Sequence, residues 1–280
     1  MTPRTPPPMA ESIRLVVSDG IARVTLARPE VRNAFNAETI EQLHDVFSRI
    51  TAADDVRAVV LAGEGKAFCG GADISWMRES LELSFDANVA DAERMSDMFR
   101  TIDNCPKPVI GQIHGAALGG GAGLAAVCDI AIAADDAIFG FTEVKLGIIP
   151  AVISPFVLAK IGASHARALF LTGERFDARR AKHIGLVHEV VAAVELGAAV
   201  EHRLEELFTA GPAAVRAAKL LIRRVIDNDY DDSRAITARA IAQQRIGSEG
   251  QEGLRAFLER RQASFVRDLE REDPSAPVSP

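Results

Sequence analysis

The sequence predicts an α/β fold followed by a helical C-terminal part, and three observations indicate it. Short, almost uniformly apolar segments alternate with helical patterns up to about residue 155. That alternation is typical of parallel strands covered on both faces by helices. Glycine-rich stretches follow two of the apolar segments, and beyond residue 155 the pattern is almost entirely helical.

The first elements expected are a hairpin and an amphipathic helix. Residues 13–28 predict two strands around Asp19-Gly20, a dipeptide that favours a tight hairpin turn. Asn36 is the expected N-cap of the helix that follows. The buried face of that helix is expected to carry Ile40, Leu43, Val46, Phe47 and Ile50.

The alternation then continues into the second half of the chain. Strands are expected at 56–65, 108–115 and 129–134, with helices at 86–103 and from about 119. Ser154 is the expected N-cap of a further helix, with Pro155 at its first position. The later helical segments predicted are 154–173, 177–187 and 194–270.

These patterns divide the chain into four parts. A proline-rich tail, residues 1–11, is expected to be disordered and carries no apolar run of the kind a signal peptide or anchor needs. The α/β core is expected at 12–200, the helical region at 201–270 and a loose tail at 271–280.

Composition excludes several classes of function. The formal net charge of −7 disfavours a nucleic-acid or anionic-membrane partner, since both select for clustered Lys and Arg. No segment has the apolar length of a membrane span. Cys69, Cys105 and Cys128 are widely spaced among apolar or small residues, so we expect reduced cysteines, a cytoplasmic protein and no metal site.

Two glycine-rich loops are the candidate site. Residues 63–77, "GEGKAFCGGADISWM", and 115–124, "GAALGGGAGL", each follow a strand and open into a helix. Backbone N–H groups in the first turn of a helix lack partners, and two such donors that converge make an oxyanion hole. Glycines at such turns also serve tight packing alone. The residues themselves therefore indicate an enzyme or a ligand binder.

Five segments resemble the enoyl-CoA hydratase/isomerase (crotonase) superfamily, over residues 12–268: "ARPEVRNAFNAETI", "GKAFCGGADISWM", "HGAALGGGAGLAAVCDIAIA", "FGFTEVKLGIIP" and "SEGQEGLRAFLERR". The resemblance implies a crotonase (ClpP-like) spiral core of ββα units and a helical C-terminal trimerisation region. It also implies a homo-oligomer, either trimer or hexamer, and an acyl-CoA substrate with no cofactor besides the coenzyme A of that substrate.

The same resemblance implies roles for individual residues. The backbone N–H groups of Ala72 and Gly120 would form the oxyanion hole, and Glu143 would be the catalytic acid. The position of the family's other acid is occupied by Gly123. Substrate or coenzyme A contacts are implied for Arg32, Ala34, Gly70, Gly71, Asp73, Ile74, Gly119 and Gly123. Asp73 and Asp129 are also interpreted as structural residues that cap helices or bind backbone amides.

The segment "LGIIPAVISPFVLAKIG" is most similar to the bacterial 3-methylglutaconyl-CoA hydratases of leucine degradation and the isohexenylglutaconyl-CoA hydratases. It implies a hydratase for a branched glutaconyl-CoA, whose distal carboxylate could hold water in the space left at Gly123. Lys145, Arg78 and Arg94 are candidate partners for that carboxylate. Two alternatives stay open: an enoyl-CoA isomerase that uses one Glu, and a non-catalytic relative that binds acyl-CoA or RNA.

Overall fold

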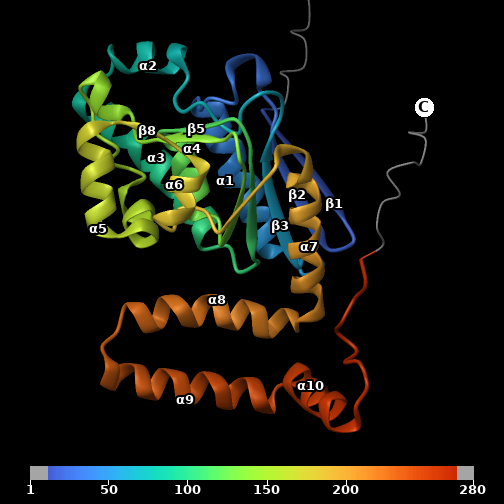
Figure 1. Ribbon diagram of the computed structural model, residues 1–280. Helices are drawn as coiled ribbons and strands as arrows, with labels where there is room; N and C mark the ends of the chain where they lie inside the picture. The colour runs from blue at the N-terminus through green and yellow to red at the C-terminus, as the bar shows by residue number, and fades with distance from the viewer. Residues whose placement is uncertain (1–11, 270–280) are drawn as a thin grey trace, which may run out of the picture. The chain divides into compact units, whose positions relative to one another are not determined.

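The computed structural model describes residues 12–269, and the tails predicted at 1–11 and 271–280 lie outside these residues. The described chain divides into a first unit, residues 12–200, and a second unit, residues 201–269. Figure 1 shows sheets and helices in the first unit and helices in the second. Each unit is described separately below.

A six-stranded sheet forms the centre of the first unit (Figure 1). Its strand β1 is antiparallel to β2, and every later neighbour pair is parallel. This confirms the α/β class with parallel neighbours. In sheet order the strands are β1 (Ile13–Ser18), β2 (Ile21–Leu26), β3 (Ala58–Gly63), β4 (Val109–Ile113), β6 (Ile130–Ala134) and β9 (Glu189–Val191).

The predicted hairpin and first helix are confirmed. Asp19 and Gly20 have φ values of 53° and 82°, as a two-residue turn matched to the twist of its strands requires. Helix α1 (Ala37–Ala52) begins where the Asn36 side chain accepts a hydrogen bond from the Thr39 N–H at 2.8 Å. All five residues predicted for its buried face are buried.

The first unit also contains a second, three-stranded sheet. It consists of β5 (Ala116–Leu118), β7 (Ile138–Gly140) and β8 (Arg175–Asp177). The sequence did not predict these strands, because three residues are too few to show a periodicity. The helices and 3-10 turns between the strands are η1 (Pro29–Val31), α2 (Ile74–Ser80), α3 (Phe85–Asp103), α4 (Gly120–Val127) and η2 (Glu143–Leu146).

The chain after residue 153 differs from the sequence expectations in four respects. Ile153, not Ser154, is the N-cap of α5 (Ser154–Thr172), because the Ser154 hydroxyl donates to the Ala151 carbonyl at 2.7 Å. Strands β8 and β9, which extend the two sheets, lie almost entirely between the predicted helical segments and were not predicted. Residues 260–269 form turns and irregular chain rather than helix. The helix α6 (Ala178–His183) is shorter than predicted.

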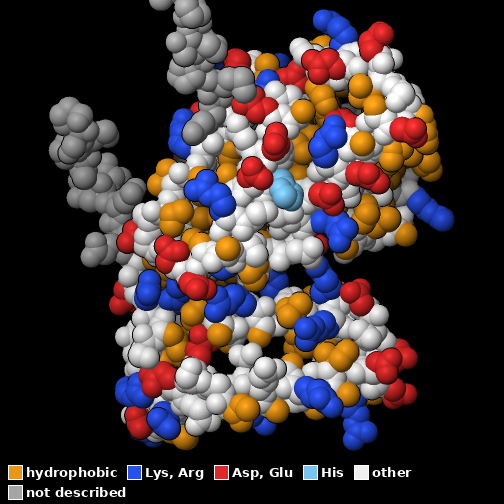
Figure 2. All heavy atoms as spheres, turned by 180° about the vertical axis from the view of Figure 1, so that it is seen from behind, with side chains coloured by type: hydrophobic (Ala, Val, Ile, Leu, Met, Phe, Trp, Pro, Cys, Tyr) orange, Lys and Arg blue, Asp and Glu red, His pale blue; other side chains and the backbone are white. Residues whose placement is uncertain are grey.

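The second unit is helical. After η3 (Ala193–Glu195), helix α7 (Leu196–Thr209) leads into α8 (Pro212–Ile226), α9 (Tyr230–Ile246) and α10 (Ser248–Glu259). Helices α8 and α9 pack together, and α10 packs against both. Figure 2 shows hydrophobic side chains among Lys, Arg, Asp and Glu on the surface of this unit. Ile226, Ile246 and Phe257 are all at least three-quarters exposed.

Candidate active site

The first glycine-rich loop is held between two segments of backbone. On one side the Phe35 N–H donates to the Gly71 carbonyl at 2.7 Å, and the Asp73 N–H donates to the Phe35 carbonyl at 2.7 Å. This is the pattern of a parallel bridge between Phe35 and Ala72. Because the groups on either side of it face Phe35, the Ala72 N–H points to the opposite side of the loop.

On that opposite side lies β5, the strand that leads into the second glycine-rich loop. Cys69 forms a parallel bridge with Ala117, in which the Leu118 N–H donates to the Cys69 carbonyl at 3.0 Å. A side chain at Gly71, where φ is 100°, would lie 3.1 Å from the Leu118 carbonyl oxygen. The glycine therefore permits the two loops to approach through their main chains.

Gly120 is the first residue of α4, so its N–H belongs to the unpaired first turn. The preceding Gly119 has φ 51° and ψ −119°, and its N–H donates to the Gly140 carbonyl at 2.8 Å. Within residues 12–269, the N–H groups of Ala72 and Gly120 donate no hydrogen bond. Two free donors thus stand at the ends of the two loops, as the sequence predicted.

Glu143 lies beside Gly119, the residue that precedes the second donor. It begins η2, and a Cβ at Gly119 would lie 3.2 Å from its Oε1 atom. Its Oε2 atom is buried and accepts no hydrogen bond within the described chain. Burial raises the pKa of this carboxyl, opposed by a hydrogen bond from its own backbone N–H. A buried acceptor without a partner costs stability, so the fold gains nothing from this atom in its present surroundings.

A cavity of about 450 Å³ brings the predicted residues together. It is lined by Glu143, by both predicted oxyanion donors and by the neighbouring glycines. Trp76 and Met77 also line it, as do the hydrophobic side chains of residues 146–153. The predicted site residues that line this cavity are Gly70, Gly71, Ala72, Gly119, Gly120 and Glu143.

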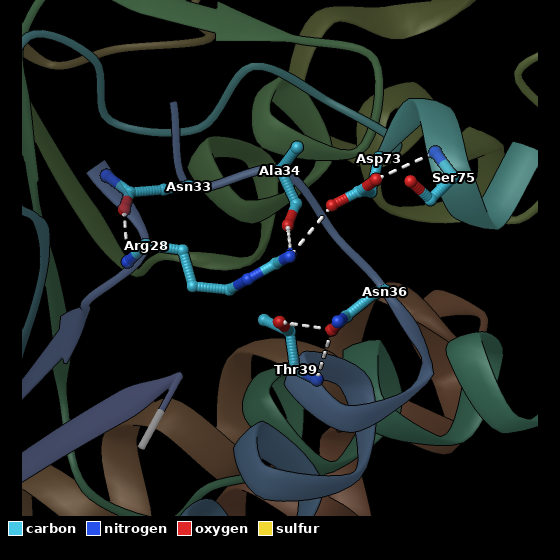
Figure 3. Close-up of polar contacts among 7 residues, drawn as sticks. All are labelled: Arg28, Asn33, Ala34, Asn36, Thr39, Asp73 and Ser75. Atoms are coloured by element: carbon cyan, nitrogen blue, oxygen red, sulfur yellow. Dashed lines mark hydrogen bonds and ion pairs between the residues drawn. The ribbon is translucent and has the colours of Figure 1, made fainter. Parts of the chain in front are cut away.

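Five predicted contact residues, Gly123 among them, lie outside the cavity lining. Arg32 is exposed on the turn after η1, and the side chain of Ile74 is 71% exposed. Ala34 and Asp73 are buried and are joined by a residue that the sequence did not single out, Arg28. The guanidinium of Arg28 donates to the Ala34 carbonyl at 2.7 Å and to Asp73 Oδ2 at 2.8 Å (Figure 3).

The structural interpretation of Asp73 and Asp129 agrees with their contacts. Asp73 caps α2 by accepting from the Ser75 N–H at 2.8 Å (Figure 3). Burial by itself would raise the pKa of Asp73, but the hydrogen bonds from Ser75 and Arg28 lower it below its ordinary value. Asp129 accepts from the Val109 N–H at 2.7 Å. Both side chains fix the backbone beside the site.

The space expected at Gly123 is not there, and that expectation is wrong. Gly123 is buried in α4 and does not line the cavity. A Cβ at this position would overlap the Cγ2 methyl group of Ile153 and would lie 3.1 Å from Phe99 Cζ. Hydrophobic side chains, not solvent, therefore occupy the region into which a side chain at 123 would project.

Sequence reasoning missed one wall of the cavity, which α3 supplies. Asn88, Asp91, Ala92 and Met95 all line the cavity. Their spacing of three, four and seven residues places them on one face of a helix. That stripe was readable in the predicted helix, but nothing in the sequence showed that it faces the glycine-rich loops.

Comparison with known proteins agrees with this fold. The enoyl-CoA hydratase/isomerase family profile matches residues 17–268. The crotonyl-CoA hydratase of Syntrophomonas wolfei is 33% identical over 258 residues, which cover 91% of this chain and 98% of that protein. These matches define the class as enoyl-CoA hydratase-type enzymes. The chain belongs to the enoyl-CoA hydratase/isomerase family.

Solved structures of relatives share the fold over nearly the whole chain. AtuE of Pseudomonas aeruginosa is 37% identical with a TM-score of 0.89, covering 92% of this chain and 100% of that one. An enoyl-CoA hydratase from Shewanella pealeana is 35% identical with a TM-score of 0.87, covering 90% and 95%. Crotonase architecture is thereby confirmed. Among residues 12–269, no helix is long and apolar enough to cross a membrane.

Proposed function

We propose that this chain hydrates the double bond of an α,β-unsaturated acyl-CoA with a single carboxylate, that of Glu143. Membership of the hydratase/isomerase family supports the reaction class. One observation carries the assignment to Glu143. Its buried Oε2 atom has no hydrogen-bond partner in the described chain, and it lines a cavity together with two unbonded backbone N–H groups.

The proposed reaction needs no other side chain. Glu143 takes a proton from water, and the resulting hydroxide adds to the β-carbon of the substrate. The electron pair of the double bond moves to the thioester oxygen, where the Ala72 and Gly120 N–H groups stabilise the enolate. Glu143 then returns the proton to the α-carbon, and the thioester carbonyl re-forms. The net change is the addition of one water molecule.

The substrate proposed from the resemblance is 3-methylglutaconyl-CoA, and the cavity lining bears directly on it. The distal carboxylate of this thioester needs a cation, but no Lys or Arg of residues 12–269 lines the cavity. Arg94 instead pairs with Asp91 at 2.7 Å, and Asp91 itself lines the cavity. Because Arg94 is already paired with Asp91 and no Lys or Arg of the described chain lines the cavity, the lining offers a distal carboxylate no cation. This favours an uncharged branched acyl end over an anionic one.

A matched pair of substrates distinguishes an anionic acyl end from an uncharged one. 3-Methylcrotonyl-CoA carries the same branch as 3-methylglutaconyl-CoA and lacks its distal carboxylate. Loss of the absorbance of the conjugated thioester measures hydration of each. We expect kcat/KM to favour the uncharged thioester by about tenfold, the effect of roughly one unfavourable charge contact. Preference for the glutaconyl thioester would require a cation from outside this chain's described residues, such as a second copy.

Isomerisation is the second candidate, and the single carboxylate favours it. Moving a double bond requires one base that carries a proton between two carbons, so Glu143 alone would suffice. The same assay with a 3-enoyl-CoA distinguishes the two, because isomerisation creates the conjugated absorbance that hydration removes. Turnover of the 3-enoyl thioester without loss of any 2-enoyl thioester would contradict the hydratase proposal.

The pH dependence of the reaction should show one ionisation. Glu143 must be ionised to accept a proton, so kcat/KM should fall with decreasing pH through its pKa. Because burial raises that pKa, the fall should begin above the ordinary Glu value of about 4.3. No decline from this group is expected at higher pH. A bell-shaped profile would indicate a second titrating group at the reacting atoms.

The raised pKa of Glu143 also predicts how the stability of the fold changes with pH. The change has the opposite sign to that produced by an ion-paired acid, whose pKa is lowered. Below about pH 4.3 the carboxyl is protonated in both folded and unfolded chains and contributes nothing. As the pH rises to the raised pKa, the unfolded chain releases its proton first, so Glu143 lowers the stability of the fold. The difference in Tm between the native protein and Glu143→Gln, measured against pH, should widen over this interval.

The second unit supports a homo-oligomer, which we propose is a trimer or a hexamer. Its helices expose large hydrophobic side chains, including Ile222, Ile226, Ile246, Phe257 and Leu258. Exposed apolar surface of this kind marks sites of association. Light scattering of the purified chain gives the number of copies directly, and a monomer at micromolar concentration would contradict the proposal.

A further inference from the structure

Gly123 and Ile153 are far apart in the sequence but pack directly against each other. Gly123 lies one turn of α4 beyond the proposed oxyanion donor Gly120. A Cβ built on Gly123 would overlap the Cγ2 atom of Ile153 and would lie 3.0 Å from its Cβ. Ile153 is 2% exposed and lines the cavity, whereas Gly123 is buried behind it. Ile153 therefore separates residue 123 from the cavity.

The surroundings of Ile153 are apolar and cannot readily shift. The Phe99 ring lies on the same side of Gly123 and packs edge-on against Phe35 at 6.2 Å between centroids. Phe99 also contacts the Phe156 ring at 5.7 Å. Phe35 and Phe99 are fully buried. A tightly packed group of this kind leaves no space for water and offers it no hydrogen-bond partner.

We propose that Ile153 occupies the position into which an acidic side chain at residue 123 would project, and so determines that Glu143 acts alone. This inference rests on the proposed function and deepens it. The wall of the cavity formed by Ile153 binds the hydrocarbon part of the substrate rather than water. Water for the reaction must then approach on the side of Glu143. This residue carries the only carboxylate of α4 and η2.

A double-mutant cycle tests the packing without any substrate. Gly123 has an ordinary helical φ, so Gly123→Ala introduces a methyl group and no backbone strain. We expect it to lower Tm by on the order of 5 °C, as an added methyl group does in a packed core. In an Ile153→Ala background the loss should be at most half as large. Equal losses in the two backgrounds would overturn the proposal.

Val152 provides the matched control for this cycle. It belongs to the same segment and lines the same cavity, but it is not among the three atoms nearest to a Cβ at Gly123. Val152→Ala should leave the effect of Gly123→Ala on Tm unchanged. A coupling with Val152 as large as that with Ile153 would show a general softening of the segment and would contradict a specific role for Ile153.

A second measurement tests the consequence for catalysis. In Gly123→Glu/Ile153→Ala the new carboxylate has the space that Ile153 leaves, so the pH profile of hydration should gain a second ionisation. A folded double variant with an unchanged single-limb profile would overturn the proposal. The double-mutant cycle is measured by Tm and needs no enzymatic activity. Failure of the hydratase assay can therefore be distinguished from failure of this inference.

Discussion

Glu143→Ala is expected to lower kcat for hydration by about 10³-fold, the usual contribution of a positioned general acid–base group. The expectation follows from the position of the carboxylate. It is the acidic side chain beside Gly119, the N-cap residue of α4, and its Oε2 atom forms no hydrogen bond within residues 12–269. The assay is the loss of conjugated thioester absorbance with the better substrate of the matched pair.

The same substitution should leave Tm unchanged or raise it, because it removes a carboxylate whose buried Oε2 atom lacks a partner. Activity lost while stability is retained distinguishes a catalytic group from a structural one. Asp91→Asn is the matched control, since Asp91 is the other acid that lines the cavity. A larger loss of kcat in Asp91→Asn than in Glu143→Ala would show that Glu143 is not the principal catalytic carboxylate.

Gly120→Ala is expected to lower kcat/KM by about 10²-fold, the effect of displacing one oxyanion-hole donor. A methyl group at Gly120 would lie 2.7 Å from Cε2 of Phe35 and 3.0 Å from Cε of Met95. The Phe35 ring is fully buried and cannot move away. The N-terminus of α4 must shift instead, and the Gly120 N–H shifts with it.

A glycine elsewhere provides the control for this substitution. Gly197 lies in α7, and a Cβ at that position meets nothing within 4 Å. Gly197→Ala should leave kcat/KM and KM unchanged, because the new methyl group enters open space. Full activity in Gly120→Ala with an unchanged Tm would mean that the loop accommodates the methyl group and that the Gly120 N–H is not a donor in the reaction.

The sequence was sufficient for features that depend on neighbours along the chain. The Asp19-Gly20 turn, the Asn36 cap and the buried face of α1 follow from backbone preferences and helical periodicity, and all were predicted. The motifs around Ala72, Gly120 and Glu143 indicated residues that indeed line one cavity. Their roles in the reaction stay predictions until the variants are measured.

Contacts between distant segments were decided only by the tertiary structure. A strand of three residues, such as β5 or β8, carries no periodic signal and exists because a partner strand lies beside it. The stripe of α3 that includes Asp91 faces the cavity through packing that no local pattern specifies.

Gly123, which lies behind the cavity wall, also separates what the sequence determined from what the tertiary structure decided. By itself the sequence determined that residue 123 carries no acid, that two glycine-rich loops exist and that Glu143 remains. Whether the absent side chain leaves space for water depends on residues thirty positions away. Folding brings Ile153 against Gly123 and fills that space with hydrocarbon. Close packing is a property of three-dimensional neighbours, so only the tertiary structure could decide it.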